Sequence, residues 1–401
     1  MKDCHYLIVI FGAIKAQYLN AIAAAGGLRM KNIAFSTGCA LLSFAICRGA
    51  ALAQDAYVAE AKAYVAKVSA PKPRWDGPTT GPAAQPKKSI VYVSADQNNG
   101  GALGVGRAVA EAAKVIGWNF RLIDGQGTAA GRTAALTQAA SFNPDGIILG
   151  TVDALEQAEA IKQIAAKGIK IVGWHALGKP GPAANRGIFT NIATDPEEVA
   201  KAAAMYAMVD SKGKAQVVIF TDPAYEIGIA KSNAMVEVIR KCAGCSVLSV
   251  ERIHHGDFRQ TSALMTQRTA LLLQRHGAKW THSIGDNDLY FDFMVPSLLA
   301  AAIPGNGQPK NISAGDGSEA AFQRIRQVHY QVATVAEPLR LHGWQAIDEL
   351  NRAFAGHKDS GYSTSVHLIN AANIKFDGGP RNEYDPDNGY RNAYKRIWTK
   401  K

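Results

Sequence analysis

Polar and aromatic side chains recur where the buried strands of this sequence are predicted to end. Carboxylates and amides accept hydroxyl hydrogens in pairs, and aromatic rings cover C–H surfaces, which is the chemistry of sugar or polyol recognition. One such loop would mean little, because loops at the carboxyl ends of strands are commonly polar and cap the next helix. Here the pattern recurs along both halves of the chain, at Asp96-Gln97-Asn98, Trp174-His175, Asp222 and Tyr225, Asp257-Phe258, Asn287-Asp288, Asp316 and Glu337.

Signatures of catalysis are missing from the same sequence. There is no G-x-S-x-G elbow, no G-x-x-x-x-G-K-[ST] phosphate loop and no H-E-x-x-H zinc motif. The stretch His254-His255-Gly256-Asp257 could ligate a metal, but adjacent histidines rarely share one ion, which favours a surface turn. We therefore expect binding without enzymatic activity, and neither a cofactor nor a metal.

The elements that must position these side chains alternate from Ser89 onward. Short apolar runs predict parallel strands buried on both faces, and apolar stripes at three- and four-residue steps predict helices. Strands are predicted at Ile90–Ser94, Asn119–Asp124, Gly146–Gly150, Lys170–Trp174, Ile188–Asn191, Gln216–Thr221, Ser246–Arg252, His282–Gly285, Asn311–Ala314 and Gln331–Ala336. Helices are predicted at Ala102–Ile116, Gly131–Phe142, Ala154–Lys167, Pro196–Val209, Ile229–Cys242, Thr261–His276, Leu289–Ala302 and Ser318–Gln327.

The alternation restarts after Thr194-Asp195-Pro196, and two successive runs predict two doubly wound parallel sheets. A (β/α)₈ barrel is the structural rival, because the units repeat evenly. The restart and the Ala/Gly/Pro-rich stretch Gly178–Ala184 favour two lobes. Ligands of such folds bind outside the carboxyl ends of the strands, in the cleft between lobes.

The N-terminal region predicts export. Met30-Lys31-Asn32 is basic, Ile33–Ile46 is mostly apolar, and Ala51-Leu52-Ala53 is a small-x-small cleavage site, the three parts of a signal peptide. We expect translation to start at Met30 and the exported chain to begin at Gln54. A buried N-terminal helix is the alternative for the apolar run, and a bipartite membrane-associated leader is the alternative for Met1–Arg29.

Composition and cysteine usage agree with an exported globular protein. The chain has 401 residues, 47% of them hydrophobic, and its net charge of +11 is spread among acids without a basic cluster, so no nucleic acid partner is expected. Outside the leader, Cys242 and Cys245 form a C-x-x-C pair that closes a predicted helix. A redox motif would open a helix and a zinc site would need a second ligand pair, so we expect a disulfide.

Several motifs in fixed order resemble those of a known family. They are the opening strand-loop-helix at Ser89, Asn143-Pro144-Asp145-Gly146-Ile147-Ile148, Gly168-Ile169-Lys170-Ile171-Val172, Ala193-Thr194-Asp195, Asn287-Asp288, Gly315-Asp316-Gly317 and Ala333-Thr334-Val335-Ala336-Glu337-Pro338. Over roughly Ser89 to Val366 the chain resembles the type I periplasmic binding proteins of bacterial sugar ABC importers, the ribose- and galactose-binding kind. The resemblance implies two lobes joined by a multi-strand hinge, with a membrane permease as partner.

The residue patterns and the resemblance together predict domain boundaries. Residues 1–53 are a leader, and residues 54–88 are a helix (Gln54–Ser69) and a linker. Lobe 1 comprises residues 89–193 plus about 338–365. Lobe 2 comprises residues 194–337, and residues 366–401 are grouped with it as a C-terminal tail.

The family's binding positions carry over to particular residues of this chain. His175 stands where the family often has an aspartate, Lys231 at a family arginine, and Phe258 at an aromatic residue that stacks on the sugar. Lysine does not reproduce the bidentate grip of a guanidinium group, so the implied ligand is a sugar other than a typical pentose, a polyol or another small polar molecule. The remaining implied ligand contacts are Asp96, Gln97, Asn98, Trp174, Asn287, Asp288, Asp316 and Glu337, the last replacing a usual glutamine.

The expected function is that of a monomeric periplasmic protein that binds a small polyhydroxylated ligand and delivers it to an ABC permease. A ligand-binding partner of a membrane sensor is one alternative. A lactose-repressor-like transcription regulator is another, because such regulators share this core. A regulator would carry an N-terminal helix-turn-helix, whereas Gln54–Lys88 has no two-helix pattern with a tight turn.

Overall fold

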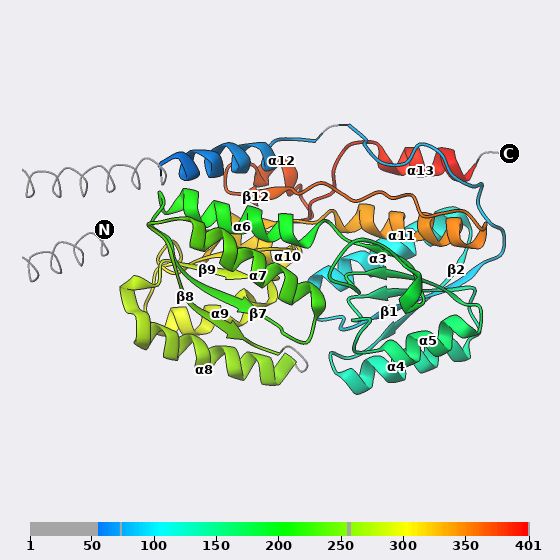
Figure 1. The fold of residues 1–401 in the computed structure, drawn as a ribbon, viewed down its shortest axis with the longest axis horizontal. Coiled ribbons are helices and arrows are strands. Elements are labelled where there is room, and N and C mark those ends of the chain that lie inside the picture. The colour runs from blue at the N-terminus through cyan, green and yellow to red at the C-terminus, as the bar shows by residue number, and fades with distance from the viewer. Residues whose placement is uncertain (1–54, 73, 255–257, 400–401) are drawn as a thin grey trace, which may run out of the picture.

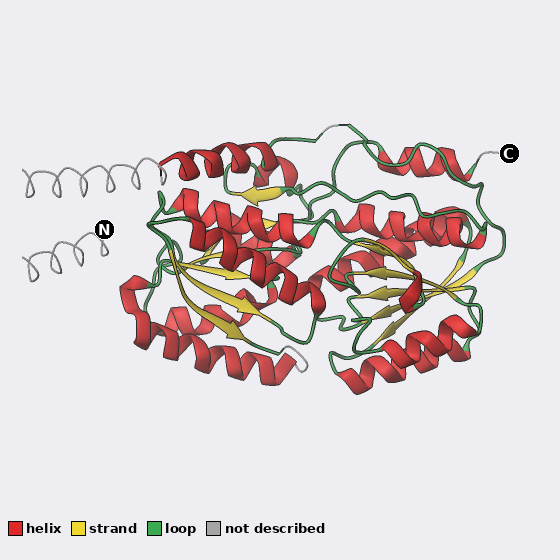
Figure 2. Ribbon diagram, viewed as in Figure 1, coloured by secondary structure: helices red, strands yellow, loops and turns green. Residues whose placement is uncertain are grey.

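The structure, a computed structural model, describes residues 55–72, 74–254 and 258–399, which form two α/β lobes side by side (Figure 1). The expected leader and its cleavage site, together with His255 and Asp257, lie outside the described residues. Each lobe has a six-stranded sheet with helices on both faces (Figure 2). Within the described part of the chain, no helix combines the length and apolarity needed to cross a bilayer.

The sheet of lobe 1 has the strand order β2-β1-β3-β4-β6-β5. All neighbours pair in parallel except β5, which pairs antiparallel with β6. The strands are β1 (Ser89–Ser94), β2 (Asn119–Asp124), β3 (Gly146–Gly150), β4 (Lys170–Trp174), β5 (Gly181–Ala183) and β6 (Ile188–Ile192). The interior strands β1 and β3 are buried along almost their whole length, because helices cover both faces of the sheet.

The sheet of lobe 2 has the strand order β12-β11-β10-β9-β7-β8. It is parallel except for β12, which pairs antiparallel with β11. The strands are β7 (Gln216–Thr221), β8 (Ser246–Arg252), β9 (His282–Gly285), β10 (Lys310–Ser313), β11 (Gln331–Val335) and β12 (Leu368–Asn370). The carboxyl ends of both parallel sheets face the junction of the lobes, so their loops meet there.

The labelled helices are α3 (Gly100–Ile116), α4 (Ala129–Ser141), α5 (Ala158–Ala166), α6 (Pro196–Asp210), α7 (Glu226–Lys241), α8 (Phe258–His276), α9 (Leu289–Ala300), α10 (Glu319–Arg326), α11 (Leu339–Phe354), α12 (Ile374–Asp377) and α13 (Tyr390–Trp398). Local capping sets several of their ends. The Asn99 side chain accepts hydrogen bonds from two backbone amides and starts α3 two residues before the expected Ala102. Asp195 caps α6, whose first residue is Pro196.

Three segments cross between the lobes. Residues 193–195 lead from β6 to α6, residues 336–338 lead from β11 back to α11, and residues 355–367 lead from α11 to β12. Helix α11 packs on α3 and β4 and therefore completes lobe 1. This arrangement confirms the predicted fold class of two doubly wound lobes with a multi-strand hinge.

The two ends of the described chain also bridge the lobes. A helix at residues 55–68 buries Ala61, Val65 and Val68 in the core of lobe 2, and Trp75 then packs among aromatic residues of lobe 1 and the tail. In the tail, β12 extends the sheet of lobe 2, whereas α13 lies on α11 of lobe 1 (Figure 1). The tail is thus divided between the lobes rather than attached to lobe 2 alone. Described residues 69–88 contain no second helix, so this region does not form the helix-turn-helix of a regulator.

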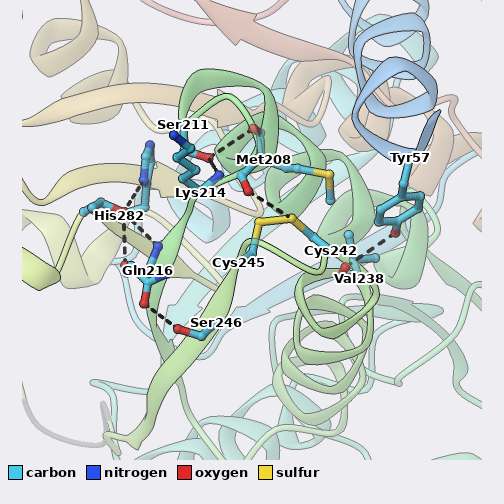
Figure 3. Close-up of a disulfide and its surroundings, with 12 residues drawn as sticks. Tyr57, Met208, Ser211, Lys214, Gln216, Val238, Cys242, Cys245, Ser246 and His282 are labelled. Carbon is cyan, nitrogen blue, oxygen red and sulfur yellow. Dashed lines mark hydrogen bonds between the residues drawn. A yellow bond between two sulfur atoms is a disulfide. The ribbon is translucent and has the colours of Figure 1, made fainter. Parts of the chain in front are cut away.

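Cys242 and Cys245 form the predicted disulfide at the carboxyl end of α7. Figure 3 shows that the bridge lies close to the N-terminal helix, whose Tyr57 hydroxyl donates a hydrogen bond of 3.4 Å to the Val238 carbonyl. Cys242 is buried in the same apolar cluster as Val65. The disulfide therefore fixes the end of the helix against which the N-terminal helix packs.

Candidate ligand-binding cleft

Loops from both lobes enclose a cavity of about 50 Å³ at the carboxyl ends of the sheets. Lobe 1 contributes Asp96 after β1 and His175 after β4, and lobe 2 contributes Lys231 from α7 and Asp316 after β10. The complete lining, which we call the inner chamber, consists of Ala95, Asp96, Asn99, Gly127, Thr151, His175, Asp222, Tyr225, Ile227, Gly228, Lys231, Asp286, Asn287, Leu289 and Asp316.

His175 lies between two buried carboxylates. Its Nε2 atom is 3.0 Å from Glu337 Oε2, and its Nδ1 atom is 3.7 Å from Asp316 Oδ1. The ring stacks on Trp174 with their centroids 4.0 Å apart, which holds the imidazole in this position. His175 from lobe 1 is therefore joined to the hinge at Glu337 and to lobe 2 at Asp316.

Lys231 adds a second basic side chain to this cluster. Its Nζ atom donates a hydrogen bond of 3.1 Å to the Asp286 carbonyl and lies 4.0 Å from Glu337 Oε1. Burial acts to raise the pKa of Glu337, but the adjacent His175 and Lys231 lower it more strongly, so the carboxylate stays charged. The Oε1 atom accepts no hydrogen bond from the described residues. The cluster thus keeps a charged carboxylate in the hinge.

Asp316 differs from Glu337 in both charge and contacts. Burial raises the pKa of Asp316 to about 6, against the opposing influence of His175 and Lys231. No hydrogen bond within the described part of the protein reaches its carboxylate, and the residue lines the cavity. A buried carboxylate that receives no hydrogen bond from the described residues can accept hydroxyl hydrogens from a ligand.

His175, Asp316 and Glu337 are the group of described residues that comes closest to a metal site, with ligand atoms within 4.8 Å of one another. Their geometry does not fit one ion, because the two nitrogens of the imidazole face different carboxylates. Lys231 already supplies positive charge beside Glu337. The arrangement fits a row of interacting polar side chains better than a metal centre.

A hydrogen-bonded chain connects this cluster to the hinge segments. Trp174 Nε1 donates to His342 Nδ1 at 3.0 Å, and His342 Nε2 donates to Thr364 Oγ1 at 2.8 Å. Thr364 Oγ1 is 2.6 Å from Thr194 Oγ1, and the Thr194 amide donates to Glu337 Oε2 at 3.2 Å. Burial lowers the pKa of His342 to about 4, so the ring is neutral at pH 7, as these donor and acceptor roles require. All three crossing segments thus share one polar network.

The Asp288 carboxylate, by contrast, already accepts hydrogen bonds from other residues of lobe 2. One carboxylate oxygen accepts from the amides of Gly317 and Ser318, and the other accepts from Gln331 and Thr334. It lines no part of the inner chamber. Asp288 therefore fixes the loop that carries Asp316.

Only some of the other expected ligand contacts line the inner chamber. Asp96 and Asn287 line the inner chamber, whereas Gln97, Asn98, Trp174 and Glu337 are not part of its lining, and Trp174 and Glu337 are fully buried. Phe258 begins α8, but its side chain, like Asp257, is outside the described residues. Asn99, Thr151 and Asp286 also line the chamber, although the sequence does not identify them as ligand contacts. None of the three belongs to a motif that distinguishes a binding residue from an ordinary helix cap or loop residue.

A second cavity of about 270 Å³, which we call the outer chamber, adjoins the inner chamber between the lobes. Asn99, Asn287, Leu289 and Asp316 line both spaces. The rest of its lining comes from lobe 1 and from the α9 and α10 regions of lobe 2, namely Asn98, Gly100, Gly101, Asp288, Asp292, Ser318, Glu319, Ala320 and Gln323.

The lobes touch directly at another rim of the cleft. Asp153 of lobe 1 accepts a hydrogen bond of 2.9 Å from the Glu226 amide at the start of α7. The Arg186 guanidinium of lobe 1 pairs with the Glu226 carboxylate at 3.1 Å and 3.3 Å. These contacts hold the lobes together on the α7 side.

Comparison with known proteins supports the fold. No curated protein matches the sequence. Among solved structures, the glucose-galactose binding protein GanP of Geobacillus stearothermophilus is 18% identical, with a TM-score of 0.62 over 73% of this chain and 100% of that chain. An ABC transporter solute binding protein of Agrobacterium vitis with bound allitol is 18% identical, with a TM-score of 0.60 over 72% of this chain and 97% of that chain. Another from the same organism, bound with α-D-tagatopyranose, is 14% identical, with a TM-score of 0.64 over 74% of this chain and 99% of that chain.

The family described as periplasmic binding protein domain matches residues 90–358, which run from β1 through β11 to the end of α11 and include two of the three segments that cross between the lobes. That span includes every described side chain of the inner chamber. The chain therefore belongs to the periplasmic binding protein domain family.

Proposed function

We propose that this protein is the solute-binding component of an ABC importer and that it holds a sugar or polyol between its two lobes. The observation that carries the proposal is the inner chamber, where Asp316 presents a buried carboxylate without a donor from the described chain. Asp96 from the other lobe lines the same space. Carboxylates from two lobes can receive hydroxyl groups on opposite sides of one ligand, which would stabilise the closed form.

Related structures support this ligand class. The solved structures of similar fold include a glucose-galactose binding protein and proteins bound with allitol and with α-D-tagatopyranose. We propose that Asp96, His175, Lys231, Asn287 and Asp316 contact the ligand, while Asp288, Trp174 and Glu337 position these groups. The role is binding and closure, without chemistry on the ligand, in a monomer that docks on a membrane permease.

Export forms part of the same proposal. The leader with its Ala51-Leu52-Ala53 cleavage site supports delivery to the periplasm, with Gln54 as the first residue of the mature chain. N-terminal sequencing of protein recovered from the periplasm would check this start. A mature chain beginning at Met1 or Met30 would contradict it.

Thermal unfolding with added ligands tests the binding role. The mature protein would be heated with D-glucose, D-galactose, allitol and D-tagatose, and with succinate as a non-sugar control. A ligand that binds the folded state raises the stability by RT ln(1 + [L]/Kd), about 2.7 kcal/mol at one hundred times Kd. We expect a raised melting temperature with at least one sugar or polyol, and a smaller rise when Asp316 is replaced by Ala. No shift with any sugar or polyol would contradict the proposed ligand class.

A further inference from the structure

The inner chamber is small for a complete sugar. Its volume of about 50 Å³ is far below the roughly 300 Å³ at the lower end of small-molecule binding pockets. Lys231 and His175 with their carboxylate partners fill the space beside it. A sugar ring in this conformation must therefore extend beyond the inner chamber.

The structure offers space in one direction. On the α7 side, Asp153 and Arg186 bind Glu226 and bring the lobes into contact. Toward α10 the inner chamber continues into the outer chamber of about 270 Å³, and the two share Asn99 and Asp316 as walls. A ligand that outgrows the inner chamber is therefore directed toward α10.

The outer chamber has the chemistry of a second binding space for hydroxyl groups. Its wall presents the side chains of Asn98, Asn287, Ser318, Glu319 and Gln323, which include both donors and acceptors. Its lining contains acids but no lysine or arginine. A neutral polyhydroxylated group matches this wall, whereas a phosphate or carboxylate would face like charge without a basic partner.

We propose that the ligand has two polar units, with a neutral second unit such as a second sugar ring bound in the outer chamber. The proposal rests on the proposed function and specifies its substrate class as a neutral disaccharide or glycoside. The first unit contacts Asp316 from the inner side, and the second unit contacts Gln323 and Asn98. Asp316, which lines both chambers, lies at the junction of the two units.

Calorimetry with paired sugars tests the proposal. The probes are D-glucose with cellobiose, D-galactose with β-1,4-galactobiose, and D-glucose 6-phosphate. We expect a disaccharide to bind at least about tenfold more tightly than its monosaccharide, because it gains hydrogen bonds in the outer chamber. We expect glucose 6-phosphate to bind no more tightly than glucose.

Two variants test whether the second unit binds in the outer chamber. Ala320→Phe puts a ring into the outer chamber and should abolish the disaccharide advantage while monosaccharide affinity is retained. Gln323→Ala should weaken disaccharide binding roughly three- to tenfold, as expected for one lost hydrogen bond. Ala134→Phe and Gln138→Ala change exposed residues of α4 outside both chambers and should have no effect.

The outcomes separate this proposal from the proposed function. Monosaccharides that bind as tightly as every disaccharide, or a disaccharide advantage that survives Ala320→Phe, would overturn the two-unit ligand and leave sugar binding intact. Tighter binding of glucose 6-phosphate than of glucose would also overturn it. Failure of every sugar to bind would overturn both.

Discussion

Asp288 and Asp316 are buried acids in neighbouring strand-end loops, yet their surroundings give them different tasks. Asp288 accepts four hydrogen bonds from its own lobe, and Asp316 accepts none from the described residues. The sequence could not separate them, because both follow a strand and both precede a helix. The partners of Asp288 include Gln331 and Thr334, which only the folded sheet brings close.

Replacing each of these acids by alanine should therefore change a different property. Asp316→Ala should weaken the binding of any sugar that the thermal unfolding screen identifies. The loss should be about 1.5–3 kcal/mol, because a buried hydrogen bond to a charged group is lost, and the fold should stay intact. Asp288→Ala should lower the free energy of unfolding by about 2–4 kcal/mol, since its four donors lose their acceptor. Calorimetry and denaturant unfolding would measure the two effects. Equal affinity in Asp316→Ala and wild type would show that the binding residues are misassigned.

His342 predicts how stability depends on pH. Burial lowers the pKa of His342 from 6.5 to about 4, so the unfolded chain takes up a proton at a higher pH than the folded chain does. The contribution of His342 to the free energy of unfolding is therefore fully present above pH 6.5. It decreases as the pH falls toward 4, by up to about 3 kcal/mol in total. His342→Gln keeps an acceptor for Trp174 and a donor for Thr364 but does not titrate, so it should lose less stability in acid. Denaturant unfolding at pH 7 and pH 5 would compare the two proteins, and equal losses would exclude His342 as the source.

At the scale of elements, periodicity and strand composition predicted the parallel core closely. The bounds of β2, β3, β4, β7, β8 and β9 agree with the expectation. The inner strands β3 and β7 are short apolar runs because helices cover both faces of the sheet, whereas the edge strands β2 and β8 are only partly buried. Helix starts were less predictable. Helix α5 begins at Ala158 instead of Ala154, since the Asp153 carboxylate accepts hydrogen bonds from the Leu155 and Glu156 amides and forms a turn first.

Elements that depend on distant contacts could not be predicted from local pattern. Strand β5 is short and pairs antiparallel with β6 inside a Gly- and Pro-rich stretch. Helix α13 has an apolar side that is explained only by its packing on α11. For the same reason, periodicity could identify strand-end loops as polar but could not say which of them the hinge brings together.

The disulfide at the end of α7 should contribute little to stability. Cys242 and Cys245 are three positions apart, and the loop-closure entropy of such a short ring is worth about 2 kcal/mol. Reduction should therefore lower the free energy of unfolding by no more than this. Unfolding with and without reductant, with alkylation to confirm the thiol state, would measure it. Alkylation of both cysteines before reduction would contradict the bridge itself.

At the scale of the whole molecule, the N-terminal segment connects the two lobes outside the hinge. Val65 is buried in lobe 2, whereas Ala66 beside it is exposed. Val65→Asp should detach the helix at residues 55–68, because a carboxylate would be buried without a partner. We expect a lower melting temperature and faster proteolysis of the segment before β1. Ala66→Asp should behave as wild type, and equal behaviour of the two variants would indicate that the helix does not stabilise lobe 2.

Because both ends of the described chain pack on the lobes, they limit the order in which the native contacts can form. Lobe 1 needs α11 and α13 from the last quarter of the chain, and lobe 2 includes the helix at residues 55–68 from the start. Neither lobe can acquire all its native contacts while its C-terminal partners are still being synthesised or threaded across a membrane. Contacts between such distant residues form slowly, because the intervening chain loses entropy before they stabilise anything. The emerging chain therefore stays incompletely folded until its last helix is released, a state compatible with export as an unfolded polypeptide.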